Sequence, residues 1–326
     1  MKIVVLCNST GGVGKTTMVY HLAHMLPRLG IPALAVDLDP QANLTAAFLD
    51  EDELEKLWDE GDKGILGSVG PILKGTGDIA EPFPLLVADG LHLISGDLGL
   101  SRFEEKLSES FAKVSLNDEA ALRATTAFYR IIHGAGEATG AEIALVDVGP
   151  NLGAINRAAL LATDHLIIPL AADLFSLQGL RNLGPTIRQW RQQWSDMQSF
   201  VSAPFLVPAG SIEPSGYVIL QHAVRLDRPE KHQAQWMQRI PDVYREAVLG
   251  TEPKAVPSPD PACLGILRNY RSLMPMAQDA RKPMFDLRPA DGAIGSHAAL
   301  AGKCHEDFEA LAQKLLEMCD LEAGSR

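Results

Sequence analysis

The sequence predicts an α/β fold, with a mostly parallel, twisted sheet and helices on both of its faces. Short apolar runs alternate along the chain with segments whose apolar residues recur at helical spacing. The runs are almost continuously apolar, as in strands that are buried on both sides, and those at 2–7 and 33–36 flank a helical pattern as in a βαβ unit. Hydrophobic residues make up 46% of the 326 residues, which is enough for a sizeable core.

The first half of the chain continues this alternation. A helix is predicted over 16–29, and Gly30 followed by Pro32 ends it. The glycines in 134–136 are expected to break the chain before the next strand. Further helices are predicted to open at 50–55, in a charged and therefore solvated segment, and to cover 100–107 and 119–133. Further strands are predicted at 93–96, 143–147 and 164–170.

The second half carries weaker signals. A helix is predicted over 179–200, where Trp190 and Trp194 lie four residues apart and are expected to face the core. Four prolines within 251–261 predict an exposed connector. The other predicted elements are strands at 217–220 and 264–267, a helix at 233–248 broken at Pro241, and a terminal helix at 305–318.

A glycine-rich bend follows the first strand and opens the first helix. The backbone N–H groups of such a bend turn inward around phosphate oxygens, and the helix dipole favours the same anion. Lys15 would supply a positive charge to the β- and γ-phosphates, and Thr16 a hydroxyl to Mg²⁺. The bend therefore predicts a nucleotide site and a fold of the P-loop NTPase type. The candidate binding residues are Thr10, Gly11, Gly12, Val13, Gly14, Lys15, Thr16 and Thr17.

The loop departs from the simplest P-loop pattern, because Ser9 stands where a glycine is expected. Residues 11–17 instead resemble the deviant loop of the ParA/MinD family. Three later segments, 37–45, 145–153 and 169–180, resemble that family's motifs in the same order. The resemblance covers about residues 1–180, where the nucleotide-binding motifs lie. It implies a single P-loop ATPase domain over 1–326.

The resemblance also implies ATP and Mg²⁺ as cofactors, with roles for the residues at the strand ends. Asp39 would position the attacking water, Asp37 would lie in the outer shell of the metal, and Gly149 would sense the γ-phosphate through its N–H. Asp147 would hold Mg²⁺ through water. The predicted catalytic residues are thus Lys15, Asp39 and Asp147, and the predicted metal residues are Thr16, Asp37 and Asp147.

Position 10 departs from the family. In ParA-type proteins a signature lysine reaches across an ATP-bound dimer to the partner's phosphates, whereas this chain has Thr10. Hydrolysis is then weak or lost, another cation substitutes, or the dimer forms differently; Arg157 is the first candidate for a substitute. We expect slow hydrolysis. The resemblance further implies an ATP-dependent homodimer and a protein partner that stimulates hydrolysis. The role it implies is partitioning or positioning of DNA or another intracellular cargo.

Charge is unevenly distributed. Residues 1–180 hold 12 Lys and Arg against 24 Asp and Glu, whereas 181–326 hold 17 of each, so a polyanion contact is expected in the second half. By resemblance, Arg268, Arg271, Arg281 and Lys282 form a candidate patch for non-specific DNA; a solvated surface is the alternative. The terminal helix is acidic, which argues against anionic membranes. With no long apolar run and no signal peptide, we expect a cytoplasmic protein.

Other functions use the same loop. A nucleotide-dependent binding switch without turnover is compatible with Thr10. A biosynthetic ATP-dependent enzyme of the dethiobiotin synthetase kind would need a small-molecule pocket and substrate-dependent ATP consumption. Iron-protein reductases need paired cluster-binding cysteines, and none follows the strand that ends at Asp147.

Overall fold

The computed structural model describes the chain except residues 62, 115–117, 200–202, 221–223, 226–227, 230, 253–256, 258, 271 and 325–326. The side chains of 224–225, 228–229, 231 and 232 are also outside the description. The predicted connector at 251–261 therefore lies partly outside the described residues, and Arg271 lies outside them altogether.

Within the described residues the core of the fold is one eight-stranded sheet in the order β10-β7-β6-β1-β5-β2-β4-β3. Neighbouring strands are parallel, except that β3 runs antiparallel to β4 at the edge. This confirms the predicted fold class. The strands are β1 (Lys2–Leu6), β2 (Ala33–Asp37), β3 (Leu85–Ala88), β4 (Leu91–Ile94), β5 (Ile143–Asp147), β6 (His165–Ala171), β7 (Glu213–Leu220) and β10 (Cys263–Leu267). Two short strands, β8 (Val224–Arg225) and β9 (Arg228–Pro229), form a separate ribbon.

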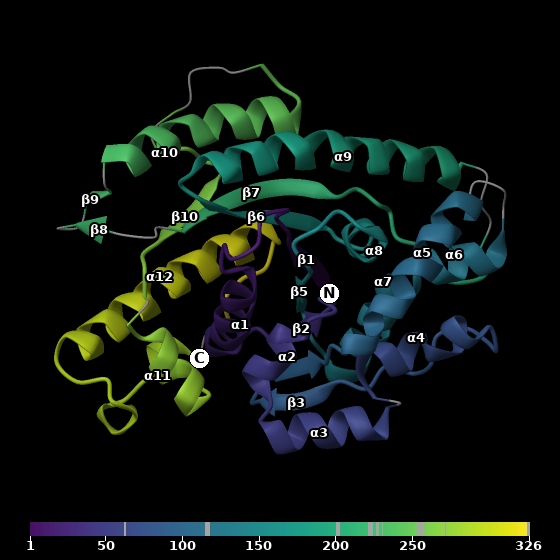
Figure 1. The fold of residues 1–326 in the computed structure, drawn as a ribbon, viewed down its shortest axis with the longest axis horizontal. Helices are drawn as coiled ribbons and strands as arrows, with labels where there is room; N and C mark the ends of the chain where they lie inside the picture. Colours follow the sequence, from purple (N-terminus) through teal and green to yellow (C-terminus); the bar gives the residue numbers. More distant parts are fainter. Residues whose placement is uncertain are drawn as a thin grey trace.

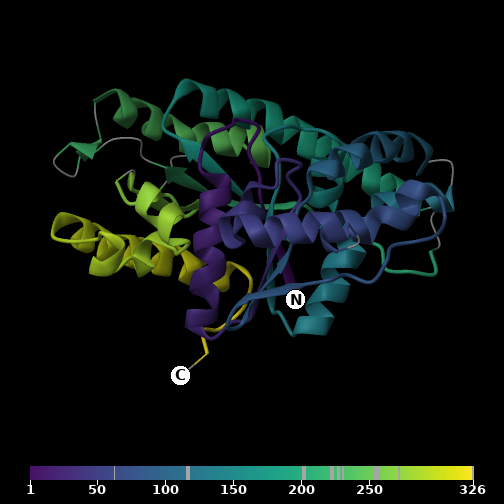
Figure 2. The same cartoon turned by 60° about the horizontal axis from the view of Figure 1, so that its bottom comes forward.

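Helices cover both faces of the sheet (Figures 1 and 2). Alternate residues of β1 show why: Ile3 and Val5 belong to one hydrophobic cluster, and Val4 and Leu6 belong to the other. The first cluster is completed by α4 (Gly64–Lys74), α5 (Ser101–Lys113), α6 (Glu119–Thr125), α7 (Ala127–Thr139), α8 (Ala154–Leu161), α9 (Leu174–Gln198), α10 (Lys231–Val243) and the π-helix η4 (Tyr244–Leu249). The second is completed by α1 (Lys15–Met25), η1 (Leu26–Leu29), α2 (Asn43–Phe48), α3 (Glu51–Glu60), α11 (Met274–Ala280), η5 (Met284–Asp286) and α12 (Ser296–Met318). Two single turns, η2 (Leu98–Leu100) and η6 (Pro289–Asp291), lie in the connections.

Several sequence predictions are wrong in detail. The glycines at 134–136 do not break the chain, because α7 runs through them. Gly136 is instead a packing position, since a Cβ there would lie 2.4 Å from the sulfur of Met1. Strand β3 was not predicted, α12 begins nine residues before residue 305, and α10 passes Pro241 and continues as η4. Trp190 and Trp194 are buried as predicted.

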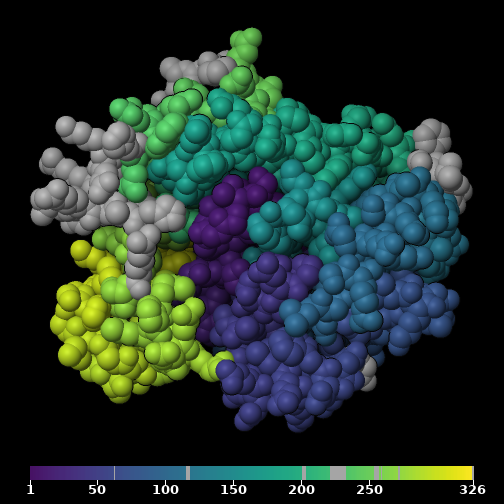
Figure 3. All heavy atoms as spheres, in the orientation of Figure 1, coloured from purple at the N-terminus to yellow at the C-terminus, as the bar shows by residue number. Residues whose placement is uncertain are grey.

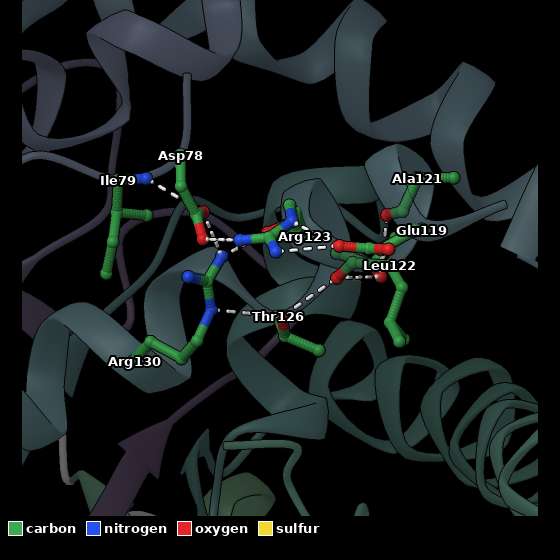
Figure 4. Close-up of polar contacts among 9 residues, drawn as sticks. Asp78, Ile79, Glu119, Ala121, Leu122, Arg123, Thr126 and Arg130 are labelled. Atoms are coloured by element: carbon green, nitrogen blue, oxygen red, sulfur yellow. Dashed lines mark hydrogen bonds and ion pairs between the residues drawn. The ribbon is translucent and has the colours of Figure 1, made fainter. Parts of the chain in front are cut away.

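A charged cluster ties the loop after α4 to α6 and α7 (Figure 4). The carboxylate of Asp78 pairs with Arg123 and, at 2.7 Å, with Arg130. Arg130 also donates to the Thr126 hydroxyl and to the Arg123 carbonyl, so its buried guanidinium is well satisfied. Both guanidinium groups lie over the ring of Phe205, which joins the loop after α9 to the same cluster.

Candidate nucleotide-binding site

The glycine-rich bend lies between β1 and α1, at the carboxyl edge of the central strand of the sheet. Gly12 and Gly14 both have φ of +75°, and Gly14 is the N-cap of α1. L-residues with side chains rarely adopt such backbone, which explains the glycines at these two positions. No side chain caps α1, so its first N–H groups face the bend and are free to bind an anion. In the space-filling view the first residues of the chain, in purple, lie in the middle of one face, between the second half and the blue segment (Figure 3).

Lys15 lies back across the bend. Its ammonium donates to the carbonyl of Asn8 at 3.3 Å, and the side chain is buried. Asn8 in turn donates to the Pro169 carbonyl of β6 at 2.5 Å and accepts from the N–H of Thr10 at 3.0 Å. The strand end and Asn8 thus fix the start of the bend. The lysine is held inside the bend, where phosphate oxygens would compete for its ammonium.

Thr10 packs against the first turns of α9. A Cβ at Gly179 would lie 3.2 Å from the Thr10 hydroxyl and 3.2 Å from that of Ser9, so the absence of a side chain at Gly179 lets the bend pack closely on α9. The side chain at position 10 is short and uncharged and lies at the side of the bend. It therefore cannot place a positive charge on the phosphates of another subunit.

Two carboxylates meet at the ends of neighbouring strands, because Asp37 of β2 and Asp147 of β5 are paired in register. The Thr16 hydroxyl donates to Oδ2 of Asp147 at 2.6 Å, whereas the buried Oδ1 has no hydrogen-bond partner among the described residues. Burial raises the pKa of Asp147 to about 7, and the charge of Asp37 adds to this, while the Thr16 hydrogen bond and Lys15 oppose it. Burial likewise raises the pKa of Asp37 to about 6, against the hydrogen bonds from Thr45.

These oxygen donors fit a hard cation. A hydroxyl and a carboxylate with one unpartnered oxygen, at the mouth of a phosphate loop, suit Mg²⁺, which takes few protein ligands besides water and phosphate oxygens. The described residues contain no cluster of three or more His, Cys, Asp or Glu that could hold a metal ion.

The segment after β2 is fixed by Asp37. Its Oδ2 accepts from the N–H and the hydroxyl of Thr45, at 2.8 and 2.7 Å, and its Oδ1 accepts from the N–H of Asp39 at 3.2 Å. The Thr45 hydroxyl also accepts from the N–H of Gly96, where a Cβ would lie 2.8 Å from the Asp37 carboxylate carbon. Thr45 and Gly96 are site residues that sequence analysis did not identify, although Thr45 is the last residue of the family-like segment 37–45. These three hydrogen bonds to Asp37 hold the segment between β2 and α2 in place.

The turn after β5, residues 148–153, is called the switch turn below. Asn156 of α8 donates to the carbonyls of Gly149 and Asn151, both at 2.7 Å, and so holds the turn from behind. A Cβ at Gly149 would lie 3.4 Å from an oxygen of Asp39, so the switch turn meets the segment after β2.

Two cavities adjoin the bend. The larger, of about 860 Å³, runs from residues 11–17 along α1 to α2 and α11, and Asp39 and Pro150 also line it. The smaller, of about 300 Å³, lies between α1 and the ends of β7 and β10. Its lining residues include Thr17, Met18, Leu220, Leu267, Arg268, Asn269 and Tyr270. The second half of the chain therefore contributes walls to the site.

Comparison with known proteins identifies this arrangement. A family model described as an AAA domain matches residues 1–199, well over half of the chain. The chain is 30% identical, over 192 residues, to the chromosome-partitioning ATPase Soj of Thermus thermophilus. The chain belongs to the ParA/MinD family of P-loop ATPases.

Structural similarity extends over the whole chain. A crystal structure of protein DIP2308 from Corynebacterium diphtheriae covers 98% of this chain and 99% of its own, with a TM-score of 0.71 at 20% identity. A putative plasmid partition protein of Borrelia burgdorferi, solved with AMPPNP, gives 97% and 98% coverage, a TM-score of 0.60 and 19% identity. At these identities the two structures establish the ParA/MinD-like fold alone. The sequence match covers 58% of this chain and 62% of Soj.

The three described basic residues of the candidate DNA patch all make polar contacts within the chain. Arg268 pairs with Asp307 at 2.9 Å, and Lys282 pairs with Asp291 at 2.8 Å. Arg281, whose φ is +49°, donates to the carbonyl of Leu49 at 2.6 Å. Arg281 and Lys282 also line the larger cavity.

Arg157, the candidate substitute for the signature lysine, is engaged in packing within the chain. Its guanidinium lies 4.1 Å from the ring centre of Phe111 and 5.8 Å from that of Trp190. It donates to Gln193 at 2.9 Å, and burial lowers its pKa to about 10. The side chain is therefore part of the packing between α8, α5 and α9.

His21 is a further site residue that sequence analysis did not identify. Its Nδ1 donates to the Thr17 carbonyl at 2.7 Å, and its Nε2 accepts from the N–H of Met284 at 3.0 Å, which fixes the neutral tautomer. Burial lowers its pKa to about 4. The ring also stacks on Phe308 of α12. His21 therefore joins the helix of the phosphate loop to the last part of the chain, a contact that no local sequence pattern reveals.

Proposed function

We propose that the chain is a single ATPase domain that acts as an ATP- and Mg²⁺-dependent switch, dimerises with ATP and hydrolyses it slowly. The observation that carries the proposal is the meeting of Lys15, Thr16 and Asp147 at the mouth of the glycine bend. One residue neutralises phosphate charge, and the other two present oxygen atoms to a cation.

Each motif then has a role. The N–H groups of residues 11–16 and the Lys15 ammonium bind the phosphates, and Thr16 with Asp147 would hold Mg²⁺, which neutralises phosphate charge when it is bound. Asp39 positions the attacking water, and the Gly149 N–H contacts the γ-phosphate. Asp37, predicted for the outer shell of the metal, also maintains the segment that carries Asp39.

The smaller cavity is our candidate for the nucleoside. It begins at Thr17 and Met18, directly beyond the phosphate loop, and its walls are largely apolar, with Leu220, Leu267 and Tyr270. Apolar walls with a few polar groups suit a flat base. The proposal adds these residues of the second half to the nucleotide site.

An exposed apolar pair supports the dimer. Leu174 and Phe175 open α9 and are 49% and 72% exposed, beside the turns of α9 that pack on Thr10. Large apolar side chains exposed next to a ligand site favour a contact with another protein. We assign this end of α9 to the interface between two ATP-bound copies.

The cargo is proposed from the relatives. Soj is a chromosome-partitioning ATPase, and the Borrelia protein is a putative plasmid partition protein. By analogy we propose that this switch partitions or positions DNA or another cargo, binds DNA non-specifically through Arg268, Arg271, Arg281 and Lys282, and has a protein partner that stimulates hydrolysis. In the described part of the chain, no helix is both long and apolar enough to cross a membrane. The cytoplasmic location remains a prediction.

Thr10 favours a second candidate, a switch that binds ATP without turnover. The side chain packs on α9 and offers no charge to a second subunit, and Arg157 is engaged elsewhere. Dissociation of the dimer would then depend on nucleotide exchange.

Nucleotide binding and hydrolysis test both candidates. We expect ATP to bind to the wild type with Mg²⁺, and Lys15→Ala and Asp147→Asn to weaken binding at least tenfold; Lys74→Ala, at an exposed lysine, is the matched control. Turnover above the Lys15→Ala background supports the slow ATPase, and binding without it supports the second candidate. Wild-type protein that binds neither ATP nor ADP would refute both.

A further inference from the structure

Glu104 of α5 caps α8 from outside that helix. Its Oε1 accepts from the N–H of Ala154, and its Oε2 accepts from the N–H of Ile155 at 2.8 Å. The N-cap residue of α8 is Gly153, which has no side chain to do this. A carboxylate fifty residues away in the sequence thus satisfies two N–H groups at the positive end of α8.

Gly153 is shaped for this contact. Its φ of −79° is open to any residue, so the glycine is not needed for the backbone conformation. A Cβ at this position would lie 2.4 Å from Oε1 of Glu104. The absence of a side chain therefore lets Glu104 approach the helix end.

The contact continues to the nucleotide side. Helix α8 begins where the switch turn ends, and Asn156 in its first turn holds the carbonyls of Gly149 and Asn151. Asn156 is buried, and its two N–H bonds define its orientation. A displacement of the start of α8 would therefore move Gly149, which faces Asp39.

We propose that Glu104 is a positioning residue, which clamps the start of α8 so that the Gly149 N–H is presented to the γ-phosphate. The role rests on the proposed nucleotide function and deepens it. A ligand with a γ-phosphate gains from the fixed switch turn, whereas ADP does not reach it. Glu104 thus contributes to the preference for ATP over ADP without touching either nucleotide.

The test combines Glu104→Ala, Glu104→Gln and Gly153→Ala, with Glu105→Gln as the matched control at the exposed neighbouring glutamate. Loss of a capping carboxylate should speed amide hydrogen exchange at residues 154 and 155 by roughly 5- to 30-fold. The ratio of the ADP and ATP dissociation constants should fall by roughly the same factor in Glu104→Ala, with ADP affinity unchanged. Glu104→Gln, which keeps one acceptor oxygen, should fall between the wild type and Glu104→Ala.

A double mutant isolates the contact. Gly153→Ala should reproduce the Glu104→Ala effect on exchange in the wild type, but should have a smaller effect in the Glu104→Ala background, where the clash with Glu104 is gone. The tight contact with Asn151, at 3.0 Å from the added Cβ, is present in both backgrounds and cancels in the cycle.

The outcomes separate the two proposals. A Glu104→Ala protein whose amides exchange faster but whose ATP preference is unchanged would make Glu104 structural and overturn the positioning role. Unchanged exchange at 154 and 155 would refute the clamp itself. Wild-type protein without nucleotide affinity would instead refute the proposed function, and the positioning role with it.

Discussion

Asp78→Asn tests whether the charged cluster of Figure 4 stabilises the fold. The substitution keeps the size of the side chain and removes its charge. Arg130, whose side chain is 8% exposed, then lacks its counter-ion, although its bonds to Thr126 and to the Arg123 carbonyl remain. Arg123 is more exposed and keeps Glu119 as a partner. The cost should therefore come mainly from Arg130.

The size of the effect follows from burial. Breaking a buried ion pair by removing one partner costs about 3–5 kcal/mol, because an uncompensated charge stays buried. Asp78 is 27% exposed, and an asparagine oxygen can still accept one hydrogen bond, so we expect a loss of about 2–3 kcal/mol in the free energy of unfolding. Asp59→Asn, at an exposed carboxylate of α3, should change it by less than about 0.5 kcal/mol.

Urea denaturation at several pH values is the assay. Burial alone would raise the pKa of Asp78, but hydrogen bonds from Arg130, the Ile79 N–H and Arg123 outweigh it and lower the pKa. The stabilisation is then present above the unfolded value of about 3.9 and is lost as the pH falls through the lower folded value. The difference between wild type and Asp78→Asn should be constant between about pH 5 and 7 and should shrink below about pH 4. An Asp78→Asn protein as stable as Asp59→Asn at pH 7 would refute this reasoning.

Three further predictions address the site. Phe175→Glu should abolish ATP-dependent dimerisation and leave ATP binding within about twofold, whereas Leu86→Glu on the edge strand β3 should dimerise normally; a dimeric Phe175→Glu protein would exclude this interface. His21→Gln should reduce the loss of stability in acid, because the unfolded chain binds a proton at His21 below about pH 6.5 whereas the buried ring stays neutral down to about pH 4. The unfolding free energy should lose about 1.4 kcal/mol per pH unit less in the variant, and identical slopes would contradict the prediction. Joint neutralisation of Arg281 and Lys282 to alanine should weaken DNA binding in the ATP state and lower the salt slope by about two, and an unchanged slope would exclude both residues from the DNA contact.

The sheet and the phosphate loop could be predicted because their signals are local. A glycine bend with Lys15, between an apolar run and a helical pattern, predicts both a strand–loop–helix unit and its binding of phosphate. The roles expected of Asp37 and Asp147 came from the family resemblance, and the structure places both residues at the ends of neighbouring parallel strands. Strand β3 was not predicted because it has only four residues, which are partly exposed at the edge of the sheet.

Other site features depend on contacts between distant segments. The bond from Met284 to His21 spans 263 residues, and the bonds from α8 to Glu104 span about fifty. Gly136 and Gly153 are indistinguishable in sequence from helix breakers or flexible turn residues, yet each makes room for a side chain from elsewhere. Arg157 follows the switch turn directly in sequence, yet its guanidinium contacts Phe111 of α5 and Gln193 of α9, which no local pattern indicates.

Sedimentation velocity with ADP, ATP and a non-hydrolysable ATP analogue tests the central claim most directly. The account predicts a monomer without nucleotide and with ADP, and a dimer with ATP–Mg²⁺ and with the analogue. Lys15→Ala should remain monomeric in every sample, and Lys74→Ala should behave as the wild type. The same sedimentation coefficient for the wild type under all conditions would contradict the ATP-dependent switch.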